Sequence, residues 1–188
     1  MSVYPSLPAP AHLEQLFSAF PKGAEPLLAL HDALLRGDSG LPVATRELIA
    51  AYVSGLNACQ FCFGAHRTMA MAFGIPAATI DALMANIETA PIEDELRPLL
   101  SYARKVTTRE GVTQEDARAV FKAGWQEADL HDVVMITSLY NFMNRLVDGS
   151  GLAAKEAFLE PSEDDLSSRR SGTYLGWGRA AGFIEADI

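Results

Sequence analysis

The chain has 188 residues, of which 49% are hydrophobic and 21% charged, and its formal net charge is −9 at pH 7. This composition is typical of one globular domain that buries a substantial core, and it differs from that of disordered chains. The excess of acidic residues disfavours binding to nucleic acids or to anionic membranes, because both require a basic face.

The N-terminal segment lacks the basic and long apolar regions of a signal peptide, and no apolar stretch approaches the roughly 18 residues of a membrane span. We therefore expect a cytoplasmic protein. In that reducing compartment, two neighbouring cysteines more often serve catalysis or metal binding than a structural disulfide.

The spacing of apolar residues predicts an all-α fold of roughly eight helices in a single domain, residues 1–188. A proline-rich arm occupies 1–10, and helices are expected at 12–20, 25–36, 45–56, 57–73, 77–85, 93–107, 113–124 and 129–147. Thr45 and Asn57 are the expected N-caps of the third and fourth helices. The tail, 161–188, is weakly helical but regains aromatic residues, and we expect it to dock on the body or on a second subunit.

The most informative motif is Glu-x11-Cys-x2-Cys-x3-His, formed by Glu47, Cys59, Cys62 and His66. At about 100° per residue, both cysteines and the histidine lie within about 60° of one another on one helix face. The first turn of that helix offers unpaired N–H groups and the positive end of the macrodipole, so we expect the pKa of one or both thiols to be lowered.

The position of Glu47 is explained by a helical hairpin. If the chain reverses near residues 56–57, Glu47 and His66 both lie about 14 Å from the turn, side by side on antiparallel helices. A carboxylate beside an imidazole orients the ring and raises its basicity. The spacing therefore predicts a proton relay from Cys62 through His66 to Glu47.

Two other interpretations of the motif stay open at this point. The cysteines could be small core residues, with a structural histidine and a carboxylate that complements the helix dipole. A zinc site is the sharper rival, in which Cys59, Cys62 and His66 are ligands and the fourth is water, His12, His31 or His131. The relay is the preferred interpretation, with no metal, because a second paired motif is missing.

The four-residue signature resembles that of alkylhydroperoxidase D type proteins, within the carboxymuconolactone decarboxylase-like superfamily. The likeness is strongest over residues 34–85, and residues 140–145 resemble the branch labelled peroxidase-related. It implies an alkylhydroperoxidase D-like helical bundle, a homo-oligomer such as a trimer or hexamer, and no bound cofactor. By the same likeness, Cys62 is the peroxidatic thiol that attacks a hydroperoxide, Cys59 the resolving thiol, and a dithiol or small redoxin the electron donor.

One residue departs from the family pattern. Phe61 stands where the best-known members carry a histidine that assists the relay through water, so proton transfer must go directly to His66 or use water. The resemblance thus favours a thiol-dependent hydroperoxide peroxidase or disulfide reductase. The alternatives are a cofactor-free lyase of the decarboxylase type and a binding protein switched by the disulfide.

A few further residues have weaker predictions. Tyr52 and Tyr140 are expected to be core residues more often than pocket residues. Asn141, Asn144 and Arg145 make an unusual polar stretch in an apolar helix, which we expect to bond across a subunit interface or to cap buried backbone groups.

Overall fold

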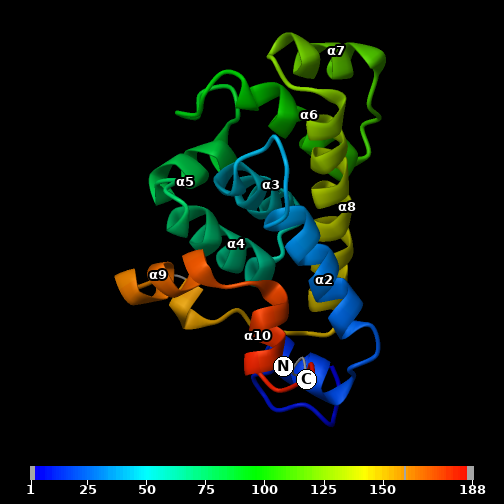
Figure 1. Cartoon of the computed structure of the whole chain (residues 1–188), viewed down its shortest axis with the longest axis vertical. Helices are drawn as coiled ribbons and strands as arrows, with labels where there is room; N and C mark the ends of the chain where they lie inside the picture. The colour runs from blue at the N-terminus through cyan, green and yellow to red at the C-terminus, as the bar shows by residue number, and fades with distance from the viewer. Residues whose placement is uncertain (1–2, 159, 186–188) are drawn as a thin grey trace.

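The computed structural model describes residues 3–158 and 160–185, and within them the chain forms ten α-helices, one short 3₁₀ helix and no strand (Figure 1). The predicted all-α class is therefore confirmed. The helices are α1 (Leu13–Ala19), α2 (Ala24–Leu35), α3 (Val43–Leu56), α4 (Gln60–Ala72), α5 (Ala77–Ala85), α6 (Leu96–Thr108), α7 (Gln114–Lys122), α8 (Glu127–Gly149), η1 (Glu156–Phe158), α9 (Glu163–Ser171) and α10 (Tyr174–Ala180).

Helix α3 lies in the middle of the bundle, with α2, α4, α5, α6 and α8 packed around it (Figure 1). Every residue from 45 to 54 is buried, which requires a helix that is mostly apolar on all sides. Its small residues, such as Ala50 and Ala51, are completely covered by the neighbouring helices. A polar side chain on this helix, such as Glu47, is therefore held inside the core.

The α3–α4 hairpin turns where the sequence predicts, but its caps differ from the prediction. Asn57 ends α3, Ala58 takes a left-handed backbone with φ 56°, and Cys59 is the N-cap of α4, its N–H donating to the Ser54 carbonyl at 3.0 Å. The prediction of Asn57 as N-cap is wrong because its side chain is engaged by α8. Thr45 is also not a cap, because α3 begins two residues earlier, at Val43 after Pro42.

The C-terminal tail is more helical than the sequence indicates, and it accounts for the two helices beyond the predicted eight. Ser162 and Asp165 form a capping box at the start of α9, and the Thr173 hydroxyl accepts from the Gly176 N–H at the start of α10. Such caps stabilise short helices whose apolar periodicity is too weak to predict them. Helix α9 packs on α4, and α10 packs on α2.

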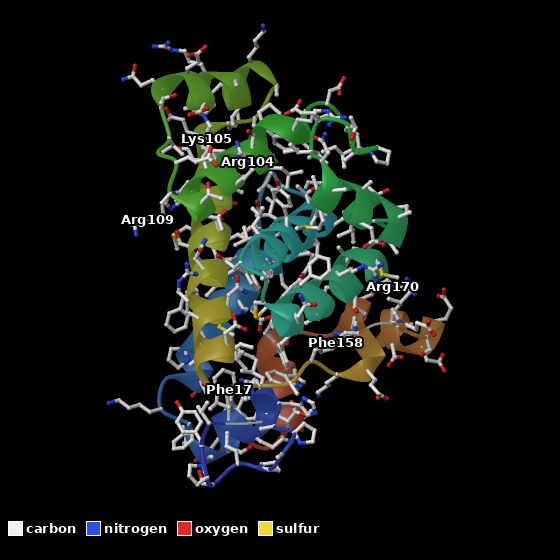
Figure 2. All side chains as sticks on the ribbon, turned by 180° about the vertical axis from the view of Figure 1, so that it is seen from behind. Phe17, Arg104, Lys105, Arg109, Phe158 and Arg170 are labelled. Atoms are coloured by element: carbon white, nitrogen blue, oxygen red, sulfur yellow. The ribbon has the colours of Figure 1, made fainter. Side chains whose placement is uncertain are left out.

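A small apolar cluster fastens α10 to the N-terminal helices. Phe17, Leu28 and Ile184 are buried in it, and Figure 2 shows Phe17 at the opposite end of the molecule from α7. A Cβ on Gly178 would lie 2.5 Å from Ile184 and 2.9 Å from Leu28, so the close approach requires glycine. Among the helices of the described ranges, none is long and apolar enough to cross a bilayer.

Candidate functional site

The two cysteines are free thiols at the start of α4, and they differ in what they face. Cys59 is completely buried, whereas Cys62 lines a cavity of about 480 Å³ between α4, α8 and the C-terminal helices. This volume lies within the range of small-molecule sites, about 300–1,000 Å³. A small molecule in the cavity can therefore reach Cys62 and finds Cys59 behind it.

The expectation of a lowered thiol pKa is wrong for Cys62. Hydrogen bonding to Cys59, burial, and the charge that Cys59 would carry all raise the pKa of the Cys62 thiol. Two sulfurs in one buried space cannot both ionise, and desolvation outweighs the helix dipole. The thiol is therefore protonated until a base removes its proton.

Asn144 on α8 opposes that rise in pKa. Its side chain hydrogen-bonds the Cys62 sulfur and lowers the thiol pKa. Asn144 is 1% exposed, donates to the Ser54 hydroxyl at 3.0 Å and accepts from the Asn57 amide at 2.8 Å. Asn141 accepts from the same amide at 3.1 Å. These asparagines thus bind the α3–α4 turn, and Asn141 also donates to the backbone carbonyl of Thr137 at 3.0 Å, which is one of the two expected roles. A bond across a subunit interface stays a prediction.

The predicted proximity of Glu47 and His66 is confirmed. The Nδ1 atom of His66 lies 2.7 Å from Oε2 of Glu47 across the α3–α4 hairpin. Glu47 is 0% exposed and His66 is 7% exposed. Because Nδ1 is committed to the carboxylate, Nε2 is the ring nitrogen left for proton transfer. Within the described part of the chain, no direct hydrogen bond joins His66 to Cys62, one turn earlier.

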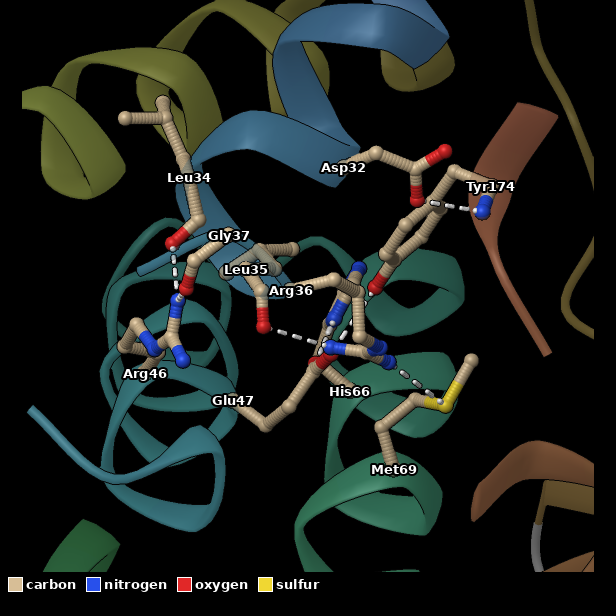
Figure 3. A network of polar contacts seen from close by, with 10 residues as sticks. All are labelled: Asp32, Leu34, Leu35, Arg36, Gly37, Arg46, Glu47, His66, Met69 and Tyr174. Atoms are coloured by element: carbon tan, nitrogen blue, oxygen red, sulfur yellow. Dashed lines mark hydrogen bonds and ion pairs between the residues drawn. The ribbon is translucent and has the colours of Figure 1, made fainter. Parts of the chain in front are cut away.

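Two further side chains bind Glu47, and neither is part of the sequence motif. Arg36, just after α2, donates to Oε1 at 2.5 Å, and the Tyr174 hydroxyl donates to the same oxygen at 2.9 Å (Figure 3). Burial alone would raise the pKa of Glu47, but the ion pairs and hydrogen bonds with His66 and Arg36 lower it. The buried carboxylate is therefore ionised and fully bonded.

The residues that bind Glu47 are themselves held in place. Arg46 donates to the carbonyls of Leu34 and Gly37, which have no helical partner at the end of α2, and so fixes the segment that carries Arg36 (Figure 3). The Asp32 carboxylate accepts from the backbone N–H groups of Tyr174 and Leu175, at 2.6 and 2.9 Å, and fixes the start of α10.

The cavity walls are mainly apolar, and Tyr140 is one of the polar residues among them. Tyr140 is completely buried and packs edge-on against the His66 ring, with 4.4 Å between ring centres. Its hydroxyl neighbours that of Tyr174 without a hydrogen bond of ordinary geometry. Phe61 packs edge-on against Phe158 at 5.6 Å and forms part of the wall. The departure at Phe61 thus makes the cavity apolar where a histidine would make it polar.

The geometry gives no support to the rival zinc interpretation. In the described ranges, no three His, Cys, Asp or Glu side chains are arranged to hold a metal ion. His12 and His31, proposed as fourth ligands, bond instead to the carbonyls of Ala153 and Leu27, at 2.8 Å each.

Comparison with known proteins identifies others with a similar sequence and fold. The sequence profile of the carboxymuconolactone decarboxylase family matches residues 21–105, which include the whole Glu-Cys-Cys-His motif. An uncharacterized peroxidase-related protein with an alkylhydroperoxidase AhpD core, from Ralstonia eutropha JMP134, is 27% identical with a TM-score of 0.72, covering 77% of this chain and 76% of its own. The chain is therefore similar to the alkylhydroperoxidase D and carboxymuconolactone decarboxylase superfamily, including a protein described as peroxidase-related.

Other solved structures share this fold at lower identity. An uncharacterized peroxidase-related protein from Silicibacter sp. TM1040 is 22% identical, with a TM-score of 0.73 and coverage of 79% of this chain and 78% of its own. A variant of the debrominase Bmp8 in complex with 2,3,4-tribromopyrrole is 14% identical, with a TM-score of 0.68 and 78% coverage of both chains. No match was found among curated proteins.

Four residues of the site escaped the sequence analysis or were assigned elsewhere. Asn144 and Tyr140 stand out in the sequence as polar residues in an apolar helix, but the sequence does not identify the residues that they contact. Arg36 gave none, since an arginine after a helix is an ordinary feature. Tyr174 belongs to the aromatic tail that was expected to dock on the body, and this docking is confirmed, but its partner Glu47 could not be named. Tyr52 is a core residue, as expected.

Proposed function

We propose that this protein is a thiol peroxidase that reduces organic hydroperoxides with the Cys59–Cys62 pair and takes its electrons from a dithiol. One observation carries the proposal: Cys62 opens onto a cavity that also contains a carboxylate-held imidazole, while a second thiol lies directly behind it. An attacking thiol needs access to substrate and to a base, and a resolving thiol needs only the attacking sulfur.

In the first step, His66 takes the Cys62 proton through Nε2 with the bound hydroperoxide or a water molecule between them, and Glu47 stabilises the imidazolium. The thiolate attacks the terminal oxygen of ROOH, the O–O bond breaks, and Cys62 becomes a sulfenic acid. The alkoxide that leaves is protonated to ROH. Asn144 assists by donating a hydrogen bond to the thiolate.

The Tyr140 hydroxyl is suited to meet the departing oxygen. Burial is the largest of the effects that raise its pKa well above the ordinary value, so it is a donor at any physiological pH. A buried hydroxyl without a partner costs about 1–3 kcal/mol, which a substrate oxygen would recover. Its pKa also means that His66, and not Tyr140, supplies the net proton.

In the second step, the Cys59 thiol attacks the Cys62 sulfur, a disulfide forms and water leaves with the Cys59 proton. A dithiol, small molecule or redoxin, then returns two electrons and two protons by thiol–disulfide exchange. Both thiols are regenerated, and no metal or organic cofactor takes part in the cycle.

The test is peroxide consumption with excess dithiol. Cys62→Ser should abolish it, and Cys59→Ser should allow one turnover that leaves a sulfenic acid, detectable by dimedone trapping. Glu47→Gln should lower the rate by about 100-fold or more, the usual contribution of general base catalysis. Equal rates in wild type and Cys62→Ser would overturn the proposal.

The same variants separate the two alternatives. A cofactor-free lyase would keep its activity when both cysteines are replaced by serine. A redox-switched binding protein would form the disulfide with peroxide but would show no sustained turnover with dithiol.

A further inference from the structure

Three cationic side chains line the cavity, and they differ in their counter-ions. Arg36 lies 2.5 Å from Glu47, and Lys155 lies 2.7 Å from Glu14. Arg169, on α9, has no carboxylate within ion-pair distance anywhere in the described ranges. Its guanidinium lies over the ring of Phe158, 5.5 Å from the ring centre.

The charges of Asp165 and Glu47 act on Arg169 and oppose the fall in its pKa, but neither carboxylate forms an ion pair with it in the described ranges. Asp165 precedes it by one turn and lines the same cavity, but its Oδ2 atom accepts from the N–H and the hydroxyl of Ser162, at 3.0 and 2.6 Å. Glu14 belongs to the ion pair with Lys155, and its second oxygen has no hydrogen-bond partner. Among the lining cations of the described ranges, Arg169 is therefore the one whose guanidinium an anion can contact without displacing a carboxylate.

Arg169 has the surroundings of a ligand-binding arginine. Burial is the main reason that its pKa is lowered, so part of its hydration is already lost. A guanidinium remains charged in any protein environment and presents a planar fork that fits a carboxylate. Phe158, which holds the guanidinium by a cation–π contact, sits on η1 beside α4, as Figure 2 shows.

Much of the rest of the cavity lining is apolar. It includes Phe61, Ala65, Met69, Met143 and Trp177. A molecule that fills this cavity needs an apolar body, with its reactive end at Cys62 and a charged end at Arg169.

We propose that Arg169 is a carboxylate-binding residue and that the cavity takes hydroperoxides of apolar monocarboxylic acids, with the carboxylate on Arg169 and the peroxide group at Cys62. The choice of hydroperoxides rests on the proposed function. The carboxylate subsite does not, because it depends only on the charge distribution in the cavity.

Binding of decanoate and methyl decanoate to the reduced full-length protein, by isothermal titration calorimetry, tests the subsite without turnover. Arg169→Gln should raise the Kd for decanoate by about tenfold to a hundredfold, as expected for a hydrogen-bonded ion pair, and leave methyl decanoate unchanged. Arg169→Lys should lose less affinity for decanoate than Arg169→Gln, because lysine keeps the positive charge although it lacks the planar guanidinium.

Two matched controls remove a positive charge without touching the subsite. Arg118→Gln changes an arginine on α7, remote from the cavity, and Lys155→Gln changes a cavity cation that already has a counter-ion. Neither should weaken decanoate binding by more than about twofold. Equal decanoate affinity in Arg169→Gln and wild type, an equal loss in Lys155→Gln, or no binding of either ligand would each overturn the proposal.

A kinetic comparison then addresses the substrate class. For a fatty acid hydroperoxide, Arg169→Gln should raise KM by about the factor found for the decanoate Kd, while KM for its methyl ester stays constant. If decanoate binding depends on Arg169 but neither hydroperoxide is consumed, the thiol peroxidase proposal fails and the carboxylate subsite stands.

Discussion

The Tyr174 hydroxyl, at the start of α10, donates a hydrogen bond to the buried Glu47 carboxylate at 2.9 Å. The two residues are 127 positions apart in the chain. Asp32 fixes the backbone of Tyr174, and the tyrosine ring lies 5.1 Å from the Arg36 guanidinium, the other donor to the same oxygen. The C-terminal helices therefore complete the site that the α3–α4 hairpin begins.

Tyr174→Phe should make the protein less stable at neutral pH and weaken the dependence of its stability on acid pH. Glu47 has a lowered pKa in the folded state, so it contributes stability above its unfolded pKa of about 4.5, and this is lost as the pH falls through the folded value. Removing a donor to the ionised carboxylate raises its folded pKa towards the unfolded value, so the variant should lose less stability between pH 7 and pH 3 than wild type. Urea unfolding from pH 3 to 7 measures this.

The size of that effect is set by one hydrogen bond to a charged group. The free energy of unfolding at pH 7 should fall by about 1–3 kcal/mol. Tyr102→Phe, on α6 away from the cavity, is the control. It should leave the fall in the free energy of unfolding between pH 7 and pH 3 as it is in wild type. If stability fell with pH in Tyr174→Phe as it does in wild type, the tyrosine would not act on Glu47.

Asn144→Ala should slow alkylation of Cys62. The amide hydrogen-bonds the Cys62 sulfur and lowers the thiol pKa, so its removal raises the pKa and reduces the thiolate fraction at a given pH. The iodoacetamide rate against pH, measured in a Cys59→Ser background, should shift to higher pH. Asn141→Ala is the control, because it bonds Asn57 but not the sulfur. A shift of equal size in both variants would assign the effect to the α3–α4 turn.

Contacts in this site could be predicted from the sequence when the two residues are close along the chain, but not when they are far apart. Glu47 and His66 could be paired in advance because a helical hairpin has fixed geometry, and their separation is only 19 residues. The link from Tyr174 to Glu47 leaves no trace in local periodicity, since α10 is docked by Asp32 and by packing on α2. Only the folded chain reveals it.

Electrostatics were harder to predict than proximity. The sequence places Cys62 in the first turn of a helix, and from that position alone a lowered pKa follows. The raised pKa results first from the hydrogen bond with Cys59 and then from burial, and neither effect can be judged without the packing of α4 against its neighbours. The helices α9 and α10 were missed for a similar reason. A capping residue indicates where a helix can begin, but whether a short helix is stable depends on its packing in the folded chain.

His31 should make the protein lose stability in mild acid. Burial is the main cause that lowers its pKa from 6.5 to about 4, so the folded state holds it neutral while the unfolded chain binds a proton. Stability from this group is complete above pH 6.5 and declines as the pH falls towards 4, by about 3 kcal/mol in total. Urea unfolding across this range should show the decline in wild type and a flatter profile in His31→Gln. An equally steep profile in the variant would assign the decline to other groups.

Gly64→Ala should destabilise the cavity wall, although alanine is ordinarily the better helix residue. A Cβ at position 64 of α4 would lie 2.9 Å from the Cβ of Phe158, so η1 must move away. The cost of such overpacking, about 1–3 kcal/mol, exceeds the gain in helix propensity of about 1 kcal/mol. Because Phe158 carries the Arg169 guanidinium, decanoate binding should weaken as well.

Gly149→Ala provides the matched comparison, since a Cβ there meets no atom within 4 Å at the end of α8. It should be neutral or slightly stabilising in urea unfolding and should bind decanoate like wild type. If Gly64→Ala were as stable as Gly149→Ala, η1 would be free to shift at no cost, and the position of Phe158 would then not be fixed by α4. A stable Gly64→Ala protein that still binds decanoate normally would further mean that Arg169 does not rely on Phe158 for its orientation.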